Sequence, residues 1–298
     1  MADKQILHML TPLNHMSPFD VNMALDAGYD AVLTYTNVTL EEVPGLVQDA
    51  IFSRPPKIGA RTGMFFGGKN AVLALDMLAA AKKAMFPPFA VSLFADPAGS
   101  FTTAAALVTC VEKVLKDKKQ RDLAKTKIAV FGATGVVGFS AAVIAALEGA
   151  DATLVGYDGP ARVSATAKEI KTRFEVDVKA ADGSDDAKKS AILAEAEVAL
   201  CAGRAGVPIL SAAQLAAARH LLVVADVNAV PPPGVEGLEM TTNGTELTPH
   251  GTLGIGPLAV GNIKYKTEFE LFRRMIVAEK AVRFDFRDAF QLARELHG

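Results

Sequence analysis

Three regularly spaced glycines are the clearest chemical signal in this sequence. Gly132, Gly135 and Gly138 lie between an apolar run, 128–131, and a second apolar run that predicts a helix. In dinucleotide-binding folds the first such glycine allows a tight turn, the second lets the backbone approach a pyrophosphate, and the third allows close packing of helix on strand. The helix N-terminus offers free N–H groups to phosphates. The pattern predicts a dinucleotide site, with an ordinary strand–helix turn as the alternative.

The residues after the next expected strand suggest ribose recognition. Asp158 lies 20 residues after Gly138, where a carboxylate can accept hydrogen bonds from the ribose 2′-hydroxyl of NAD. Arg162 fits either a partner for the 2′-phosphate of NADP or a solvated residue in the first turn of a helix. The sequence therefore predicts mixed use of NAD and NADP.

Later strand ends extend this candidate site, because ligands bind at the carboxyl edge of such sheets. Asp226 and Asn228 fit contacts to the nicotinamide side and turn capping equally well. Gly254 and Gly256 fit either backbone contacts to the nicotinamide or a simple turn. The candidate nucleotide-binding residues are Gly132, Ala133, Thr134, Gly135, Val136, Val137, Gly138, Tyr157, Asp158, Arg162, Ala202, Gly203, Arg204, Asp226, Asn228, Gly254 and Gly256.

A second set of polar residues follows expected strands in the first part of the chain. Their place at strand ends predicts a substrate-binding edge. Ser100 and Asp20 also fit a helix-capping role. The candidate substrate-binding residues from this pattern are His15, Ser17, Asp20, Asp96, Ser100, Thr102 and Thr103.

The elements that must position these residues alternate between apolar runs and longer amphipathic runs. This alternation predicts an α/β protein with two doubly wound parallel-sheet domains, the second Rossmann-like, and a cleft between them. The first domain is expected over 1–122 with C-terminal helices returning over about 265–298, and the second over 123–264. Strands are expected at 5–10, 31–36, 61–66, 89–94, 128–131, 152–155, 176–180, 198–201 and 221–225, and the stretch 251–261 is expected to be a glycine-rich loop.

Composition excludes several classes of protein. The 298 residues are 50% hydrophobic, and 31 basic residues against 33 acidic ones leave no basic face for nucleic acid. No apolar run reaches the roughly 18 residues needed to span a bilayer, and no signal peptide is seen, so a soluble cytoplasmic protein is expected. Cys110 and Cys201 lie in apolar contexts and are expected to be buried free thiols.

The absence of several motifs limits the kinds of reaction that the sequence suggests. The five histidines are scattered and form no metal-binding pattern, so no metal is expected. There is no P-loop lysine motif and no nucleophile elbow. No His/Asp pair of the hydroxy-acid dehydrogenase type is evident, which favours a reaction that moves a hydride without a proton. We therefore expect no essential general base.

Several blocks together resemble one known family. They are Ser17-Pro18-Phe19-Asp20, Gly67-Gly68-Lys69-Asn70, the run from Asp96 to Ala106, Gly132-Ala133-Thr134-Gly135, Ala225-Asp226-Val227-Asn228-Ala229 and Leu253-Gly254-Ile255-Gly256. Over essentially the whole chain the sequence resembles bacterial NAD(P)-dependent methylene-tetrahydromethanopterin dehydrogenases. It is most similar to the form that accepts both nucleotides, because Tyr157-Asp158 stands where the NADP-only form carries basic residues.

This resemblance implies one-carbon oxidation in formaldehyde metabolism. Methylene-tetrahydromethanopterin would give a hydride to NAD or NADP and become the methenyl cation. Asp20 would bind pterin N–H groups or favour the cation, and Lys264 and Lys266 would contact substrate or be solvated. The resemblance also implies a homo-oligomer. The alternatives are a methylene-tetrahydrofolate dehydrogenase, another two-domain NAD(P) dehydrogenase such as one for a shikimate-like substrate, and a nucleotide sensor without catalysis.

Overall fold

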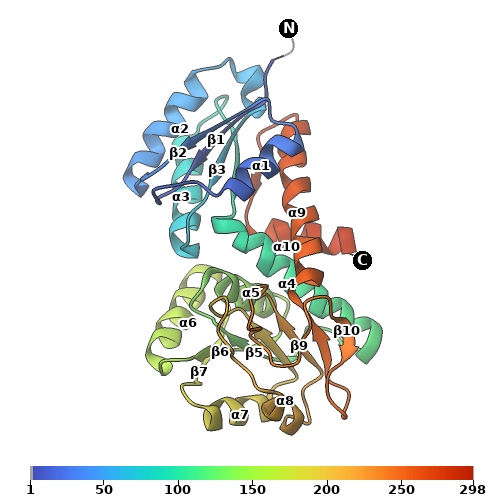
Figure 1. Ribbon diagram of the computed structural model, residues 1–298. Helices are drawn as coiled ribbons and strands as arrows, with labels where there is room; N and C mark the ends of the chain where they lie inside the picture. Colours follow the sequence, from blue (N-terminus) through green and yellow to red (C-terminus); the bar gives the residue numbers. More distant parts are fainter. Residues whose placement is uncertain (1–2, 298) are drawn as a thin grey trace. The chain divides into compact units, whose positions relative to one another are not determined.

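The computed structural model describes residues 3–297, which divide into two compact units (Figure 1). The first unit runs to Thr102 and also includes Tyr265–Leu292. The second contains Thr103–Lys264 and the residues from Ala293 onward. This division differs from the expected boundary at 122, because most of helix α4 (Ser100–Val114) belongs to the second unit.

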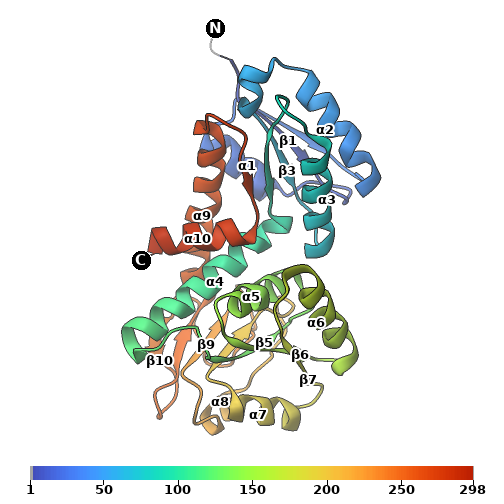
Figure 2. The ribbon, with the colours of Figure 1, turned by 180° about the vertical axis from the view of Figure 1, so that it is seen from behind.

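The first unit contains a five-stranded parallel sheet with the strand order β12-β4-β3-β1-β2. Helices α2 and α3 cover one face, and α1 and α9 cover the other (Figures 1 and 2). The strands are β1 (Ile6–Leu10), β2 (Ala31–Tyr35), β3 (Thr62–Phe66), β4 (Ser92–Ala95) and β12 (Arg283–Phe284). The helices are α1 (Pro18–Ala27), α2 (Val43–Phe52), α3 (Ala71–Ala84), most of α9 (Pro257–Val277) and the first part of α10 (Phe286–His297).

Local sequence explains the ends of α1. The Ser17 side chain accepts a hydrogen bond from the Asp20 N–H, Pro18 fills the first helical position, and Gly28 ends the helix with φ 113°. A proline at the start and a left-handed glycine at the end are each favoured for steric reasons. These residues therefore set both ends of the helix.

The core of the first unit depends on residues from both ends of the chain. The rings of Phe65 and Phe94 lie 5.4 Å apart, and Phe272 of α9 lies 5.6 and 5.3 Å from them. Strand β12 pairs with β4, and the Leu93 N–H donates to the Val282 carbonyl at 2.8 Å. The C-terminal segment thus completes both the core and the sheet of this unit.

The second unit contains a seven-stranded sheet with the order β10-β11-β9-β8-β5-β6-β7. All neighbouring strands are parallel except β10 and β11. The order β7-β6-β5-β8-β9-β11 is that of the doubly wound dinucleotide-binding fold. The strands are β5 (Lys127–Phe131), β6 (Asp151–Gly156), β7 (Lys179–Asp182), β8 (Val198–Cys201), β9 (Val223–Asp226), β10 (Asn243–Glu246) and β11 (Leu253–Ile255). The helices are α5 (Val136–Leu147), α6 (Pro160–Phe174), α7 (Asp186–Glu195) and α8 (Ala212–Ala217).

The prediction of a loop over residues 251–261 is wrong. This stretch contains β11 and the start of α9, which begins at Pro257 rather than near Lys264. A Cβ on Gly256 would lie 2.3 Å from the Glu239 carbonyl oxygen, so the glycine is needed for close backbone packing. Glycines that permit strand packing and glycines that form loops look alike in a sequence.

Helix α4 is part of a longer helical stretch. Pro97–Lys119 is apolar and long enough to cross a membrane by composition, but 78% of its apolar window is buried in the protein. Cys110 lies in this stretch, and both it and Cys201 are buried free thiols, as expected.

An ion-pair network ties the end of α10 to the second unit. The Arg294 guanidinium donates to both Glu112 carboxylate oxygens at 2.7 Å and to Glu148 at 2.6 Å. Lys116 also pairs with Glu112 at 3.0 Å. Burial raises the pKa of Glu112, but the hydrogen bonds from Arg294 and Lys116 outweigh it and leave the pKa below its ordinary value.

Candidate functional site

The loop between β5 and α5 has the backbone geometry of a phosphate-binding turn. Gly132 has φ 78°, and a Cβ there would lie 2.3 Å from the Ala202 carbonyl oxygen. Gly135 is the N-cap of α5 and has no side chain to occupy the helix end. The first N–H groups of an α-helix have no partner within the helix, so this end can bind an anion.

Gly138 has the packing role expected of the third glycine. A Cβ at this position would lie 2.4 Å from the Gly132 carbonyl oxygen and 2.8 Å from the Ala133 Cα. No side chain fits there without moving the loop. The structure therefore brings the three glycines together in one tight strand–loop–helix turn.

The residues after β6 meet this loop through one side chain. Arg162 donates to Asp158 at 3.0 Å, to the Tyr157 hydroxyl at 3.0 Å and to the Thr134 hydroxyl at 3.3 Å. Its guanidinium carbon lies 5.7 Å from the Tyr157 ring centre. Arg162 thus connects the expected ribose-binding segment with the phosphate loop, and all four side chains come from the predicted set.

Asp226 and Asn228 turn inward to hold backbone. The Asp226 carboxylate accepts hydrogen bonds from the Asn228 and Gly234 N–H groups at 3.0 and 2.8 Å. Asn228 accepts from Gly206 and Val230 and donates to the Pro232 carbonyl. Burial raises the pKa of Asp226 despite these bonds. Of the two roles left open by the sequence, the structure favours turn capping.

Five further candidates of the second unit differ in exposure. Ala202 and Gly203 follow β8 next to Gly132, whereas Arg204 is exposed. Gly254 is buried in β11, where a Cβ would lie 2.6 Å from the Leu247 side chain, so its lack of a side chain serves packing within the unit. The same holds for Gly256.

The substrate candidates of the first unit lie at the carboxyl edge of its sheet. The register pairs Leu10 with Phe66 and Phe66 with Ala95, so the segments after β1, β3 and β4 are neighbours. Ser17 and Ser100 are half-buried there and His15 is exposed. These positions agree with the expected substrate-binding edge.

Asp96 and Thr102 form a closed hydrogen-bonded turn at the start of α4. Asp96 accepts from the Phe101 and Thr102 N–H groups at 2.7 and 3.3 Å and from the Thr102 hydroxyl at 2.6 Å. Neither side chain has exposed surface. Their geometry is that of a helix cap, which shapes the edge rather than presenting groups to a substrate.

The remaining candidates are distributed over both units. Asp20 is buried at 1% exposure and Lys266 is exposed in the first unit, whereas Thr103 and Lys264 are half-buried in the second. Sequence reasoning missed Glu268, a fully buried carboxyl group of α9. Its only signal was a charged residue four positions before Phe272, on the same apolar helix face.

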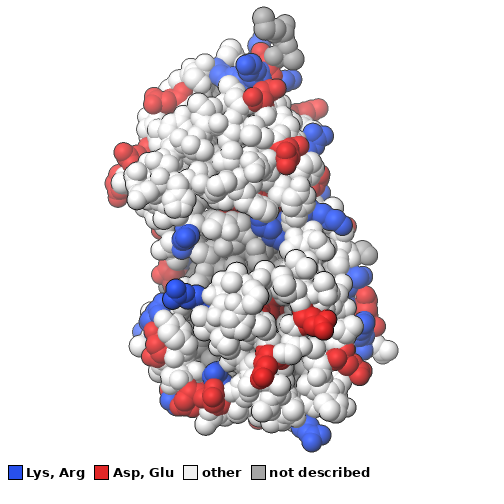
Figure 3. Space-filling view, in the orientation of Figure 1, with Lys and Arg blue, Asp and Glu red and all other residues white. Residues whose placement is uncertain are grey.

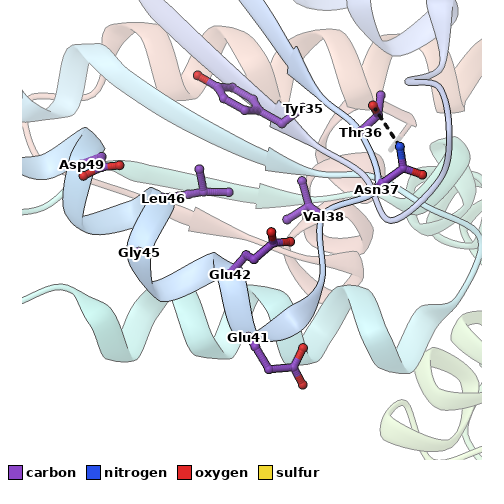
Figure 4. Close-up of a pocket in the computed structure, with 9 residues that line it drawn as sticks. All are labelled: Tyr35, Thr36, Asn37, Val38, Glu41, Glu42, Gly45, Leu46 and Asp49. Atoms are coloured by element: carbon purple, nitrogen blue, oxygen red, sulfur yellow. Dashed lines mark hydrogen bonds between the residues drawn. The ribbon is translucent and has the colours of Figure 1, made fainter.

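A separate cavity of about 560 Å³ lies beside the end of β2 (Figure 4). Its lining includes the carboxylates of Glu41, Glu42 and Asp49, and Glu42 accepts a hydrogen bond from the Thr39 N–H. None of the predicted site residues lines it. Its carboxylates would repel nucleotide phosphates, so this cavity is not the nucleotide site.

On the face shown in Figure 3, Lys and Arg are interspersed with Asp and Glu and form no large patch of one sign. Among residues 3–297, no group of three or more His, Cys, Asp or Glu side chains is arranged to hold a metal ion.

Comparisons with known proteins show which proteins the sequence is similar to. Residues 18–98 match the family model described as methylene-tetrahydromethanopterin dehydrogenase, N-terminal. The chain is 53% identical over 295 residues to the NAD(P)-dependent methylenetetrahydromethanopterin dehydrogenase of Methylorubrum extorquens, covering 99% of both chains. It is 33% identical to the bifunctional protein MdtA of the same organism, covering 94% of both chains.

Solved structures support the fold alone. The NAD-dependent malic enzyme of Thermotoga maritima matches with TM-score 0.57 at 12% identity, covering 97% of this chain and 84% of that one. A shikimate 5-dehydrogenase of Listeria monocytogenes in complex with shikimate and NAD matches with TM-score 0.50 at 17% identity, covering 99% of this chain and 96% of that one. The identity of 53% over 99% of both chains shows that the chain belongs to the family of NAD(P)-dependent methylene-tetrahydromethanopterin dehydrogenases.

Proposed function

We propose that this protein transfers a hydride reversibly between methylene-tetrahydromethanopterin and NAD(P)⁺, with methenyl-tetrahydromethanopterin as the oxidised product. The observation that carries the proposal is 53% identity over 99% of both chains to an enzyme named for this activity. The nucleotide turn of the second unit supplies the site that such an activity requires.

The residues present fit a dinucleotide. Gly132 and Gly138 leave a cradle of main chain that a Cβ would fill, and the N-terminus of α5 opens onto it. We propose that this turn holds the pyrophosphate and that Asp158 and Arg162 hold the adenosine ribose. When bound, the nicotinamide ring supplies the hydride acceptor. Ala202 and Gly203, beside the turn, would form part of the pocket wall.

The chemistry of the pterin explains why no general base is expected. The carbon that loses the hydride is bonded to two nitrogens, whose lone pairs stabilise the resulting cation, so no proton has to leave. The protein therefore acts by orienting the donor and by its electrostatic field. Carboxylates favour a developing cation, and the buried Asp20 of the first unit is a candidate for this role.

We propose further that the carboxyl edge of the first sheet binds the pterin. Ser17, Ser100 and His15 offer polar groups along this edge, while Asp96 and Thr102 fix its shape. Thr103, Lys264 and Lys266 remain candidates for substrate contact.

The test is a direct assay with the full-length protein. Methylene-tetrahydromethanopterin is mixed with NAD or NADP, and the reduced nucleotide is followed by its absorbance. Reduction of either nucleotide supports the proposal. Binding of nucleotide without turnover would contradict it and favour a nucleotide sensor, and turnover of the tetrahydrofolate analogue alone would reassign the substrate.

Self-association and a cytoplasmic location are also proposed. The surface we propose for self-association is an aromatic cluster formed by the exposed Phe52 and Phe86 and the half-buried Phe89, whose ring centres lie 5.2–5.9 Å apart. Exposed apolar patches are common at contacts between subunits. Light scattering of the wild-type protein and of Phe52→Ser tests it, and a monomeric wild type would contradict it. The buried free thiols agree with a reducing compartment.

A further inference from the structure

Two loops at the carboxyl edge of the second sheet are joined by backbone hydrogen bonds from Ile209 and Leu210 to the Gly234 carbonyl, and by one side chain, that of Asn228. The β8 loop (residues 202–210) and the β9 loop (residues 227–234) follow strands β8 and β9. Asn228 accepts hydrogen bonds from the Gly206 N–H of the first loop at 3.2 Å and from the Val230 N–H of the second at 2.9 Å. Its amide nitrogen donates to the Pro232 carbonyl at 3.0 Å. The side chain of Asn228 thus makes three hydrogen bonds to the two loops, and the residue is 7% exposed.

Asp226 supports this arrangement from the end of β9. Its two oxygens accept from the Asn228 N–H at 3.0 Å and from the Gly234 N–H at 2.8 Å, so it fixes both ends of the β9 loop. A Cβ on Gly234 would lie 2.8 Å from the Asp226 carboxylate, so the close approach of this backbone to Asp226 requires glycine. The position of Asn228 is thereby set by a fully buried carboxyl group.

The β8 loop in turn lies against the phosphate turn. The Ala202 N–H donates to the Phe131 carbonyl at 2.9 Å, and a Cβ on Gly132 would lie 2.7 Å from the Gly203 nitrogen. A shift of the β8 loop would therefore displace the glycine turn between β5 and α5. The side-chain hydrogen bonds of Asn228 connect the β9 loop with the β8 loop, which lies against the phosphate turn.

We propose that Asn228 is a positioning residue for the nicotinamide half of the bound nucleotide. In the doubly wound fold, β5, β6 and β7 serve one mononucleotide half, and β8 and the strands beyond it serve the other. The side-chain hydrogen bonds of Asn228 go to the second set of loops. It holds their main chain at the distance from the phosphate turn that the nicotinamide half requires. The inference rests on the proposed function insofar as the nucleotide is NAD(P).

This role predicts a selective binding defect. Asn228→Ala removes three hydrogen bonds that lie outside the adenosine half of the site. The dissociation constant for NADP should rise at least about tenfold, as expected for loss of more than one buried hydrogen bond. The dissociation constant for adenosine 2′,5′-bisphosphate, which lacks the nicotinamide half, should change less than about twofold. A purely structural role would weaken both ligands together.

The experiment measures both dissociation constants by calorimetry on the full-length protein. Asn243→Ala, a change of the same type at an exposed position of β10, is the matched control and should alter neither constant. In the assay with pterin, the KM for NADP should rise while the KM for the pterin stays unchanged. Asn228→Asp keeps the two accepted bonds and loses the donated one. It should give an intermediate NADP constant, and it serves as the test if the alanine variant fails to fold.

Two results would overturn the proposal. One is an unchanged NADP constant in Asn228→Ala, and the other is an equal loss of both ligands in a folded variant. Neither depends on the pterin reaction. If wild-type protein binds NADP but does not oxidise the pterin, the proposed function fails while the binding comparison still decides the role of Asn228.

Discussion

The Nη1 atom of Arg162 lies 3.0 Å from Oδ2 of Asp158, one helical turn away in sequence. In such folds a carboxylate like that of Asp158 favours the 2′-hydroxyl of the ribose, and an arginine like Arg162 favours a 2′-phosphate. Here the two side chains lie next to each other. Thr134 of the phosphate turn holds the other end of the same guanidinium. We propose that each nucleotide uses a different member of this pair, which would allow the site to accept either one.

Replacement of either residue should shift the nucleotide preference in opposite directions. Asp158→Ala should weaken NAD about tenfold relative to NADP, because the ribose hydroxyls lose their acceptor. Arg162→Ala should weaken NADP about tenfold relative to NAD, because the phosphate loses its cation. The ratio of kcat/KM for the two nucleotides measures both effects. Equal losses for both nucleotides in each variant would place the pair outside the ribose site.

The third glycine of the turn should tolerate no side chain. Gly138→Ala places a Cβ 2.4 Å from the Gly132 carbonyl oxygen. We expect a loss of about 1–3 kcal/mol in the free energy of unfolding and weaker nucleotide binding. The matched control is Gly261→Ala in α9, where nothing lies within 4 Å of the new Cβ. That change should stabilise the protein by roughly 0.5–1 kcal/mol. Denaturant unfolding compares the two, and similar stabilities would refute the packing argument.

Hydride transfer without a proton has an isotopic signature. Deuterium at the methylene carbon of the pterin should slow the chemical step, since its C–H bond breaks. Deuterated water should leave the same step unchanged, because no O–H or N–H bond breaks with it. Single-turnover mixing isolates the step from product release. A large solvent effect there would show that a side chain of the protein takes a proton.

The network around Glu112 should stabilise the protein in a pH-dependent way. Arg294→Ala leaves a carboxylate of 8% side-chain exposure with only Lys116, and we expect a loss of about 2–3 kcal/mol. The pKa of Glu112 is lowered in the folded state from an ordinary 4.5, so its contribution is present above about pH 4.5. It is lost as the pH falls below that value toward the folded-state pKa.

Denaturant unfolding between neutral and acid pH checks this prediction. The difference between wild type and Arg294→Ala should narrow as the pH falls. The control is Lys113→Ala, which breaks an exposed pair with Asp117 and should cost less than about 1 kcal/mol at any pH. A difference that does not depend on pH would mean that Arg294 acts through packing alone.

The two thiols should be unreactive in the folded protein. Burial raises the pKa of Cys110 to about 12, and burial together with the nearby Asp226 charge raises the pKa of Cys201 well above its ordinary value. The thiolate is the reactive form, so a disulfide reagent should label neither cysteine at neutral pH. Both should react once the chain is unfolded in denaturant. Rapid labelling of the native protein would contradict this prediction.

Features encoded by neighbouring residues were predictable from the sequence. The helix from Pro18 to Gly28 and the turn from Gly132 to Gly138 have caps and glycines within a few residues of one another. The prediction of two parallel-sheet α/β units is confirmed for the same reason, since each strand–helix alternation is local.

Features that depend on distant partners were not predictable. Strand β12 has two residues, and its place in the sheet is set by β4, far away in sequence. The sequence placed Asp96 at a strand end but could not show that Thr102 and the start of α4 satisfy its carboxylate. For Asn228 the partners are backbone groups of two loops, which no side-chain pattern reveals.

The pairing of β12 with β4 also has a consequence for synthesis on the ribosome. The bond between Val282 and Ser92 spans 190 residues. At about 5–20 residues per second, roughly 10–40 s pass between the emergence of the two segments. During that interval the first sheet lacks its edge strand and its core lacks Phe272, while nearly all of the second unit is made. The unit that begins the chain therefore lacks part of its sheet and core until most of the second unit has been made.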